Sequence, residues 1–409
     1  MTSFLRDALQ KFVVDSNSAL EFKLIRKSED VDDESLAFSP EMSHQVFGDN
    51  ESVFGYQDLK IKLYYTAGNL STYLGTEYKK KINPAQFDGA TADDITGMIS
   101  EKIPAGYSTN MDEFLKQLKK EKSFMPFGEM LHSHKINPGE ASERCFEFYL
   151  CDIEAPRFRE FHERLQTFLL WYIDAASYID ADDHKWRYYL VFEKYKIDGE
   201  YRYATCGYAT VYLYYAYPNN LRPRISQFLV LPPFQKLGLG AELLDVIYRS
   251  FSKDDQIVDV TVEDPSDDFV RLRDFVDTRN CSKLEPFQPE KLRQGFSPFM
   301  VQEARDKLKL NKKQVRRVYE ILRFRATNTA DAQEYRNYRL DIKNRLNIPY
   351  QKEASDFNKL KRALNAEELK SAMSTMNKEQ RLENLERQYR TLEDHYKHVL
   401  ERLAAAALH

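Results

Sequence analysis

The sequence predicts an α+β protein: a mixed sheet flanked by helices, with an N-terminal α/β domain and a C-terminal helical extension. Three observations lead to this fold class. The middle of the chain alternates aromatic and β-branched runs, typical of strands, with helical patterns. The preceding section mixes short strands, turns and helices. The C-terminal section is highly charged, and its apolar residues recur three and four positions apart.

Length and composition favour a well-packed protein of two or three domains. The chain has 409 residues, of which 42% are hydrophobic and 13% aromatic, so it can bury large cores. Its formal net charge of −4 argues against direct nucleic-acid binding, which normally needs a strongly basic domain. The four cysteines form no CxxC pair, which predicts free thiols and no cysteine-based zinc site.

The termini and the hydropathy pattern bear on location. The N-terminus lacks a signal-peptide pattern, and no apolar run approaches the roughly 20 residues that a membrane span needs. We therefore expect no membrane partner and a location in nucleus and cytoplasm. Residues 404–409 resemble a vector-derived scar and carry no functional argument.

Four sections are predicted along the chain. Residues 1–125 form a mixed α/β domain, and residues 126–265 form the domain with the strongest strand and helix patterns. Residues 266–325 form a helical domain, and residues 326–409 form a charged helical or coiled-coil extension.

Individual elements follow from local patterns. Pro265 is expected to hold Asp264 in an extended conformation. We expect strands at 21–25, 60–65, 186–192, 202–217, 224–231 and 257–262, and helices at 112–120, 158–179, 240–251, 269–276 and 307–322.

The C-terminal extension carries a heptad seam of about three heptads. Two interpretations stay open: a helical hairpin within the chain that packs on Leu360 and Leu364, and a dimer zipper. Asn365 with Glu368 resembles a capping box that begins a new helix. The seam consists of Leu382, Leu385, Tyr389, Leu392, Tyr396, Val399 and Leu403.

A strand, two prolines, a glycine loop and a helix follow one another within 224–251. N–H groups at a helix N-terminus carry a positive dipole and bind pyrophosphate. Gly238 and Gly240 let the backbone approach phosphates without a Cβ in the way, and Lys236 adds positive charge. The loop lacks the Gly-Lys-[Ser/Thr] ending of a P-loop and the third glycine of a dinucleotide fingerprint. From these residues alone, an ordinary glycine-rich turn between strand and helix stays open as an alternative.

This unit resembles the acetyl-CoA loop of the GNAT acetyltransferase superfamily, and its surroundings resemble the type B histone acetyltransferase catalytic subunits within it. The resemblance runs from about residue 20 through 325. It lies in the loop itself and in 43–49 (SHQVFGD), 163–168 (ERLQTF), 222–227 (RPRISQ), 263–266 (EDPS), 272–275 (LRDF) and 316–320 (RRVYE).

The resemblance implies a GNAT-type sheet, with residues 126–265 as the acetyl-CoA-binding catalytic domain and residues 1–125 on the substrate side. It implies acetyl transfer from acetyl-CoA to a lysine on the N-terminal tail of a newly synthesised histone, which we expect to be histone four. A WD-repeat histone chaperone is the implied partner. Two alternatives stay open: a GNAT enzyme for another protein or small-molecule amine, and a non-catalytic histone-binding scaffold.

The resemblance also assigns the cofactor contacts. Phe228, Leu229 and Val230 would contact the acetyl and pantetheine part of acetyl-CoA. The pyrophosphate would be held by Gln235, Lys236, Leu237, Gly238, Leu239, Gly240 and Ala241.

The reaction needs a base, because a free lysine has a pKa near 10.4 and its deprotonation at neutral pH costs about 4 kcal/mol. A carboxylate whose pKa is raised by burial can accept that proton. The resemblance implies Glu263 as general base, with Asp264 as helper or alternative. From the residues alone, both belong to a polar strand end. Asp174, on the helix predicted at 158–179, is a third candidate, because closely similar enzymes have glutamate there beside the active site.

A basic histone tail needs acidic and aromatic partners. The resemblance implies a peptide groove lined by the turn residues Asp49, Asn50 and Glu51 and by the strand residues Tyr212, Leu213 and Tyr214. From spacing alone, these are ordinary turn and strand residues.

No metal is expected. His132 and His134 form an HxH pair, but no carboxylate or cysteine lies at a spacing that would complete a metal site. Structural histidines are the simpler interpretation of this pair.

Overall fold

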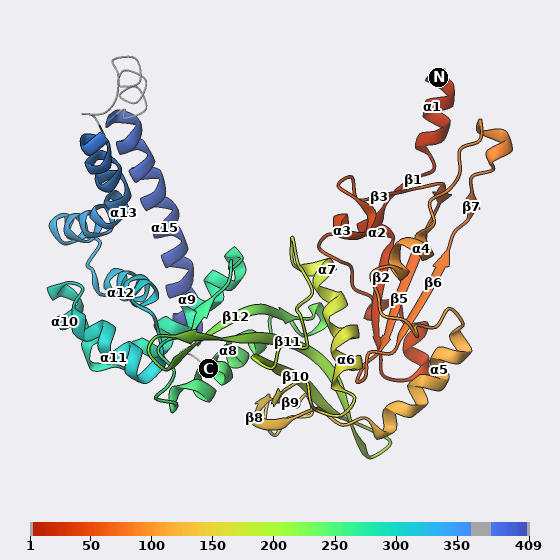
Figure 1. Cartoon of the computed structure of the whole chain (residues 1–409), viewed down its shortest axis with the longest axis horizontal. Helices are drawn as coiled ribbons and strands as arrows, with labels where there is room; N and C mark the ends of the chain where they lie inside the picture. Colours follow the sequence, from red (N-terminus) through yellow and green to blue (C-terminus); the bar gives the residue numbers. More distant parts are fainter. Residues whose placement is uncertain (1–2, 361–377, 407–409) are drawn as a thin grey trace. The chain divides into compact units, whose positions relative to one another are not determined.

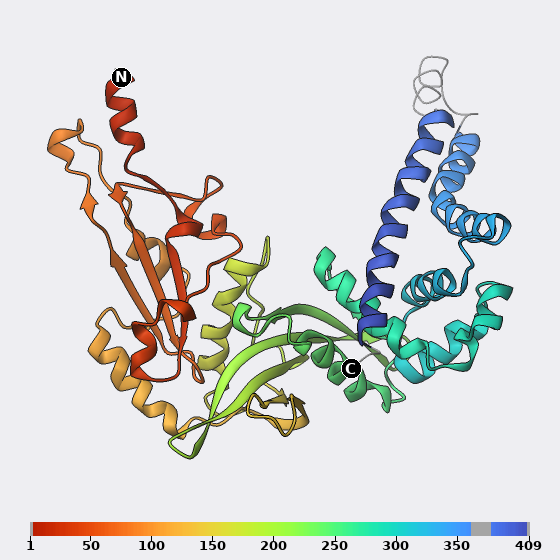
Figure 2. The ribbon, with the colours of Figure 1, turned by 180° about the vertical axis from the view of Figure 1, so that it is seen from behind.

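The computed structural model describes residues 3–360 and 378–406, which divide into two compact units. The first comprises 3–215 and 223–247, and the second comprises 216–222, 248–360 and 378–406. Figures 1 and 2 show their elements from opposite sides. Among the described helices, none has both the length and the apolar character needed to cross a bilayer.

The first unit begins with a three-stranded sheet. β2 (Leu20–Ile25) pairs in parallel with β5 (Lys60–Thr66), which pairs antiparallel with β6 (Thr72–Glu77). α5 (Met111–Lys120) packs on this sheet through Phe114 and Leu118. Shorter elements surround it: α1 (Ser3–Gln10), β1 (Val13–Asp15), α2 (Ser16–Ala19), α3 (His44–Phe47), β3 (Ser52–Phe54), β4 (Tyr56–Gln57), β7 (Lys80–Lys81) and α4 (Ile95–Ser100).

A larger sheet follows in the first unit, with neighbouring strands in the order β12-β11-β10-β9-β8. From β8 to β11 each pair of neighbours is antiparallel. α8 (Leu239–Ser252) follows the last strand, so the predicted strand–loop–helix is present. The strands are β8 (Glu129–Ile136), β9 (Arg144–Cys151), β10 (Trp186–Ile197), β11 (Glu200–Ala216) and β12 (Asn220–Val230).

One helical segment, which runs from α6 (Phe158–Leu165) through the 3-10 turn Gln166–Phe168 to α7 (Leu169–Tyr172), packs on both sheets. The Phe168 ring lies 4.6 Å from that of Tyr65 on β5, and the Phe158 ring lies 4.9 Å from that of Tyr188 on β10. This segment therefore joins the N-terminal sheet to the larger sheet.

The helix predicted over 158–179 is too long, because it ends at Tyr172. Ile173 is extended (φ −130°, ψ 115°), and Ala175 has a left-handed φ of 53°, which a right-handed helix cannot continue. Asp174 was expected on this helix, and this was wrong: it lies in the loop after α7.

The second unit is mainly helical, and three local predictions within it were wrong. The helix expected at 307–322 is two helices, because Lys309 has a left-handed φ of 55° and the Asn311 side chain caps α12. The strand expected at 257–262 is only β13 (Thr261–Val262). Asp264 is not extended but has a φ of 31°, a region that the short Asp side chain tolerates. The helices are α9 (Asp267–Cys281), α10 (Pro289–Gln294), α11 (Pro298–Leu308), α12 (Lys312–Ala326), α13 (Ala332–Leu360) and α15 (Lys378–Ala406).

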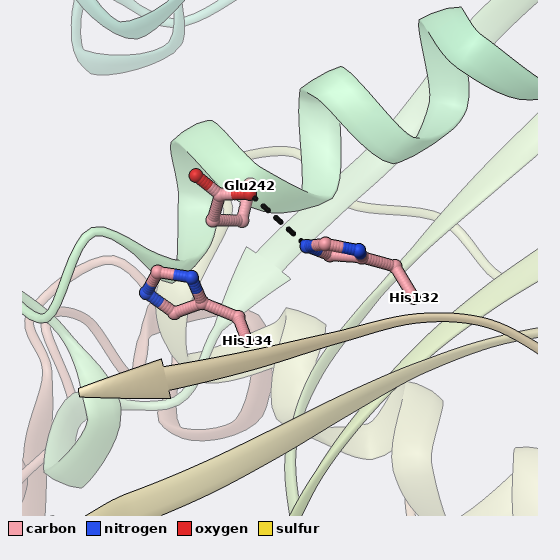
Figure 3. Close-up of side chains that lie close together, drawn as sticks. All are labelled: His132, His134 and Glu242. Carbon is pink, nitrogen blue, oxygen red and sulfur yellow. Dashed lines mark ion pairs between the residues drawn. The ribbon is translucent and has the colours of Figure 1, made fainter. Parts of the chain in front are cut away.

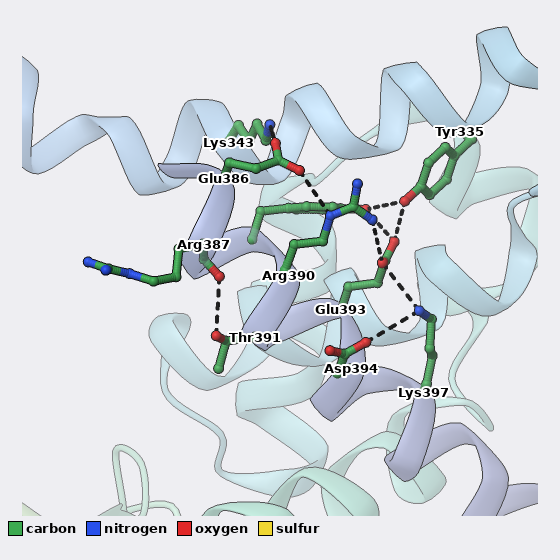
Figure 4. A network of polar contacts seen from close by, with 10 residues as sticks. Tyr335, Lys343, Glu386, Arg387, Arg390, Thr391, Glu393, Asp394 and Lys397 are labelled. Carbon is green, nitrogen blue, oxygen red and sulfur yellow. Dashed lines mark hydrogen bonds and ion pairs between the residues drawn. The ribbon is translucent and has the colours of Figure 1, made fainter. Parts of the chain in front are cut away.

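The heptad seam on α15 packs within the chain. Tyr389 and Tyr396 are fully buried. The Tyr396 hydroxyl donates to buried Glu320 of α12 at 2.8 Å, and His395 Nε2 lies 2.7 Å from buried Asp274 of α9. Figure 4 shows a further polar network between α15 and α13. These contacts favour the hairpin interpretation over the zipper.

The N-terminal end of the seam is not buried as Tyr389 and Tyr396 are, because Leu382 is 56% exposed. Leu364 and the capping box of Asn365 and Glu368 lie outside the described residues, as do residues 407–409.

Candidate functional site

The glycine loop between β12 and α8 leaves donors open at a helix N-terminus. Gln235 Nε2 donates to the carbonyl oxygen of Val230 at 2.9 Å, which folds the loop back onto the end of its own strand. Gly238 has a φ of +81°, and a Cβ built there meets no atom within 4 Å. The space above this residue is therefore open.

The backbone N–H groups of the loop are available to bind a ligand. Gly238 accepts from the N–H groups of Ala241 and Glu242 at 3.0 and 3.2 Å. Among the described residues, the N–H groups of 236–240 donate to no protein acceptor. Unpaired N–H groups beside the first turn of a helix form an anion site, so this loop fits a pyrophosphate.

The strand before the loop has two unlike faces. Leu229 is buried in the core, whereas Phe228 and Val230 are half-buried on the opposite face. Side chains alternate along a strand, so only these two can present side chains to a ligand on that face. Leu229 could contribute its backbone alone.

Asp174, a candidate base, and Glu51, a candidate groove residue, both lie beside the imidazole of His44. His44 Nε2 lies 3.1 Å from Oδ1 of Asp174, and His44 Nδ1 lies 3.6 Å from Oε1 of Glu51. Asp174 is 76% exposed, and its role as a candidate base stays a prediction. Asp49 and Asn50 are exposed in the adjoining turn.

Glu51 has a structural task. Its Oε1 accepts from the backbone N–H groups of Ser43 and His44 at 2.6 and 3.1 Å, and its Oε2 accepts from Asn17 Nδ2 at 2.8 Å. The hydrogen bond from the Ser43 N–H, with help from Asn17 and His44, holds the pKa of Glu51 below its usual value. Glu51 therefore stays negative while it holds the start of α3.

The aromatic residues on β11 form an exposed patch. Tyr212 and Tyr214 are two positions apart on one face of the strand, with their ring centroids 4.6 Å apart. The Tyr212 hydroxyl donates to Asp183 at 2.7 Å, which raises the pKa of Tyr212 and lowers that of Asp183. The Arg224 guanidinium lies 4.8 Å from the Tyr214 ring centroid.

Gln227 connects this aromatic strand to the loop that holds Asp174. Its Oε1 accepts from the Thr210 hydroxyl of β11 at 3.3 Å, and its Nε2 donates to the carbonyl oxygen of Ser177 at 3.1 Å. Gln45 Nε2 in turn donates to Ala176 at 2.9 Å. Hydrogen bonds thus run from β11 through 174–177 to α3, and join the two halves of the predicted groove within one unit.

Glu263 and Asp264 belong to the second unit, directly after β13. The segment that leads to them runs parallel to the first residues of β12, because Leu221 bridges Ile257 and the Arg222 side chain pairs with Asp259 at 2.6 Å. Both carboxylates are exposed. Their place beside the cofactor loop of the first unit stays a prediction.

Sequence reasoning missed three residues around the site. His44 and Gln227 lie within segments that carry the family resemblance, but neither was assigned a role. Glu242 was not considered as a partner of the HxH pair. Glu242 lies close to both His132 and His134. Long-range pairing brings these residues together, and no short-range spacing could have revealed it.

Two family models match the chain. The model of the histone acetyl transferase HAT1 N-terminus matches residues 12–174, and the C-terminal model of the histone acetyltransferase type B catalytic subunit matches residues 273–324.

Full-length relatives agree with these models. The histone acetyltransferase type B catalytic subunit of Homo sapiens is 47% identical over 98% of this chain and 96% of that protein. The protein of the same name from Rattus norvegicus is 46% identical over the same shares. A relative with this name from Dictyostelium discoideum is 36% identical over 79% of this chain and 70% of its own length.

Among solved structures, an aminoglycoside acetyltransferase from an uncultured soil metagenomic sample aligns at 14% identity. It covers 31% of this chain and 82% of its own, with a TM-score of 0.23, a likeness too slight to carry an argument. The full-length relatives carry the assignment: the chain belongs to the family of histone acetyltransferase type B catalytic subunits, and it is an acetyltransferase.

Proposed function

We propose that this acetyltransferase moves the acetyl group of acetyl-CoA to lysine side chains on the N-terminal tail of newly synthesised histone, with histone four as substrate. One observation carries the proposal: within the part of the chain that the structure describes, the N–H groups of 236–240 at the start of α8 donate to no protein acceptor, beneath open space at Gly238. An anion site of this kind fits the pyrophosphate of coenzyme A.

The loop residues Gln235, Lys236, Leu237, Gly238, Leu239, Gly240 and Ala241 would hold the pyrophosphate. Phe228 and Val230 would line the pantetheine arm with their side chains, and Leu229 would contribute backbone groups. A backbone N–H on 228–230 directed at the thioester carbonyl would stabilise the oxyanion that develops there.

The groove for the histone tail would lie between the acidic turn and the aromatic strand. Asp49 and Glu51 supply negative charge, and Asn50 supplies hydrogen-bonding groups. Tyr212 and Tyr214 supply ring faces for the stem and ammonium group of a lysine, and Leu213 extends the strand that the peptide follows. The negative charge of Glu51 matches a basic substrate.

The reaction needs two proton transfers and one substitution. The lysine ammonium first gives one proton to a base, and its Nε then forms a bond to the acetyl carbon while the C–S bond breaks. The nitrogen loses its second proton, and the departing coenzyme A sulfur takes up a proton to become a thiol. We assign the removal of the amine proton to Glu263, with Asp264 as its helper. Glu263 is exposed in this chain, so the bound substrates must supply the burial that raises its basicity.

The test is the initial rate of acetylation of a histone-four tail peptide between pH 6 and 9, with wild type, Glu263→Gln and Asp264→Asn. We expect Glu263→Gln to bind acetyl-CoA normally and to lose at least a hundredfold in kcat, with part of the rate restored at high pH. Asp264→Asn should lose less. Acetyl-CoA binding without acetylation of the peptide by wild type would overturn the substrate assignment, and equal rates for Glu263→Gln and wild type would overturn the base.

We also propose a WD-repeat histone chaperone as partner and a location in nucleus and cytoplasm. The family resemblance is the support for both. Co-elution of the full chain with such a chaperone in size-exclusion chromatography tests the partner, and separate elution of the two at micromolar concentration would contradict it.

A further inference from the structure

Two histidines on β8 face one carboxylate on α8. β8 is an edge strand of the larger sheet, and α8 begins directly after the glycine loop. Figure 3 shows His132 and His134 projecting from the strand toward Glu242 in the first turn of the helix. We propose that these three side chains form a binding site for a divalent transition-metal ion such as Zn²⁺.

The strand geometry aims both rings at the helix. Residues two apart on a strand share a face, and along β8 His132 and His134 are half-buried whereas Ser133 and Lys135 are exposed. The register with β9 shifts between Met130 and His132. An extra residue at such a bulge re-aims the side chains that follow it.

The distances suit a small metal ion. Nε2 of His132 lies 3.5 Å from Oε2 of Glu242, and one ligand atom from each of the three residues lies within 4.8 Å of the others. In a tetrahedral zinc site the bonds of about 2.0–2.2 Å place neighbouring ligand atoms about 3.3 Å apart. His132 and Glu242 are thus already near this spacing, and a small side-chain rotation brings His134 to it.

The donor set is that of a zinc site with an open position. Two imidazole nitrogens and one carboxylate oxygen are borderline ligands that suit Zn²⁺ and its neighbours in the first transition row, and they leave a fourth position for water. Cys145 does not belong to the set, because its sulfur lies 3.5 Å from the Ser133 hydroxyl, on the other face of β8. The site is therefore not a cysteine-based one.

His134 favours a bound ion over a plain ion pair. The contact between His132 and Glu242 alone needs only a protonated imidazole. His134 also faces the carboxylate, yet within residues 3–360 and 378–406 its ring makes no hydrogen bond or ion pair. Two protonated rings at this separation would repel each other, whereas one metal ion can bind both neutral rings and the carboxylate.

An occupied site would fasten the edge strand to the first turn of α8. The bond would join elements about a hundred residues apart in sequence, and it would stabilise the folded chain according to the free metal concentration. The ion would act next to the loop of 236–240 without forming part of it.

The experiment is a Zn²⁺ titration of the full chain by calorimetry, after treatment with a chelator, with Co²⁺ absorption as a second measurement. We expect one ion per chain, visible bands typical of tetrahedral Co²⁺, and a higher melting temperature with zinc. His134→Ala and Glu242→Gln should each weaken binding at least tenfold and abolish the cobalt bands. Circular dichroism of the metal-free variants shows whether they fold, and loss of the bands in folded variants supports the site.

Two matched controls separate this site from adventitious binding. His184 forms an exposed ion pair with Glu154 at 3.3 Å. Among the described residues, this pair has no third ligand that would complete a metal cluster. His184→Ala should therefore bind the metal as wild type does. Cys145→Ser should do likewise. Absence of binding at micromolar Zn²⁺, or equal binding by wild type and a His132→Ala/His134→Ala double variant, would overturn the proposal.

Discussion

His44 holds Asp174 and Glu51 together: its Nε2 lies 3.1 Å from the first carboxylate and its Nδ1 lies 3.6 Å from the second. Glu51 is fixed by the backbone of α3, so the imidazole ties the loop after α7 to a rigid anchor. Asp174 therefore acts on the position of that loop. This arrangement makes His44 a positioning residue for the proposed peptide groove.

The first prediction concerns this tie. His44→Ala frees the loop of 173–177, so the KM for the histone-four peptide should rise about two- to fivefold, the factor that corresponds to an exposed charge pair of up to about 1 kcal/mol. The KM for acetyl-CoA should stay unchanged, because the glycine loop is not touched. Steady-state kinetics with each substrate varied in turn make the comparison.

A histidine outside the first unit provides the control. His398 is exposed on α15 and lies against its own helix backbone, so His398→Ala should leave both KM values as in wild type. A larger rise in the KM for acetyl-CoA than for peptide in His44→Ala would contradict the positioning role.

The second prediction separates backbone strain from cofactor binding. Gly238 and Gly139 have φ values of +81° and +82°, and a Cβ at either meets no atom within 4 Å. Alanine at either position should therefore destabilise the fold by a similar amount, about 1 kcal/mol. Only Gly238→Ala should raise the KM for acetyl-CoA, about five- to tenfold, because its Cβ fills the space where the phosphates bind.

Calorimetric binding of coenzyme A and thermal unfolding of both variants provide the measurements. Equal losses of cofactor affinity in the two variants would mean that strain alone is responsible, and the loop would lose its assigned role.

The sequence predicted the strand–loop–helix of 224–251 well because its signals are local. Pro232 and Pro233 end the strand, the glycines follow, and α8 begins at Leu239, one residue before the expected start. The environment of Asp174 was not predictable in this way. The apolar spacing predicted a helix that runs through Ile179 and includes Asp174. In the structure Ile179 is only half-buried, and the left-handed φ at Ala175 prevents the helix from continuing.

The groups of side chains around His132 and His44 could not be predicted from local sequence patterns, for a different reason. Glu242 reaches His132 and His134 only because the sheet order brings β8 near the helix that follows β12. His44 meets Asp174 across the join between the two sheets. Contacts between residues more than a hundred positions apart depend on tertiary packing. The spacing of residues along a single sequence does not reveal such contacts.

The third prediction concerns the aromatic patch. The Tyr214 side chain is 41% exposed beside Arg224, so it is available to a lysine stem, whereas the Tyr212 hydroxyl is engaged by Asp183. Tyr214→Ala should raise the KM for the peptide about fivefold, corresponding to a cation–π contact of about 1 kcal/mol, and Tyr214→Phe should be close to wild type. The same loss in both variants would show that the hydroxyl, not the ring, carries the contact.

The last prediction concerns the second unit. Asp277 is buried on α9, 3.3 Å from Arg273 Nε, and burial raises its pKa to about 7. The folded state therefore binds this proton more tightly than the unfolded state, whose carboxyl has its ordinary value of 3.8. Between about pH 4 and pH 7 the contribution to the free energy of unfolding falls as the pH rises, and above pH 7 it is constant.

Asp277→Asn removes this titration. Asparagine carries no charge at any pH, so the free energy of unfolding of the variant should lack the fall that wild type shows from pH 5 to 8, on the order of 1–4 kcal/mol. Urea unfolding at pH 5, 6, 7 and 8 measures the difference between the two proteins. Asp306→Asn, at an exposed carboxylate on α11, should run parallel to wild type. If the Asp277→Asn curve also runs parallel to wild type, Asp277 is ionised throughout and Arg273 outweighs the cost of burial.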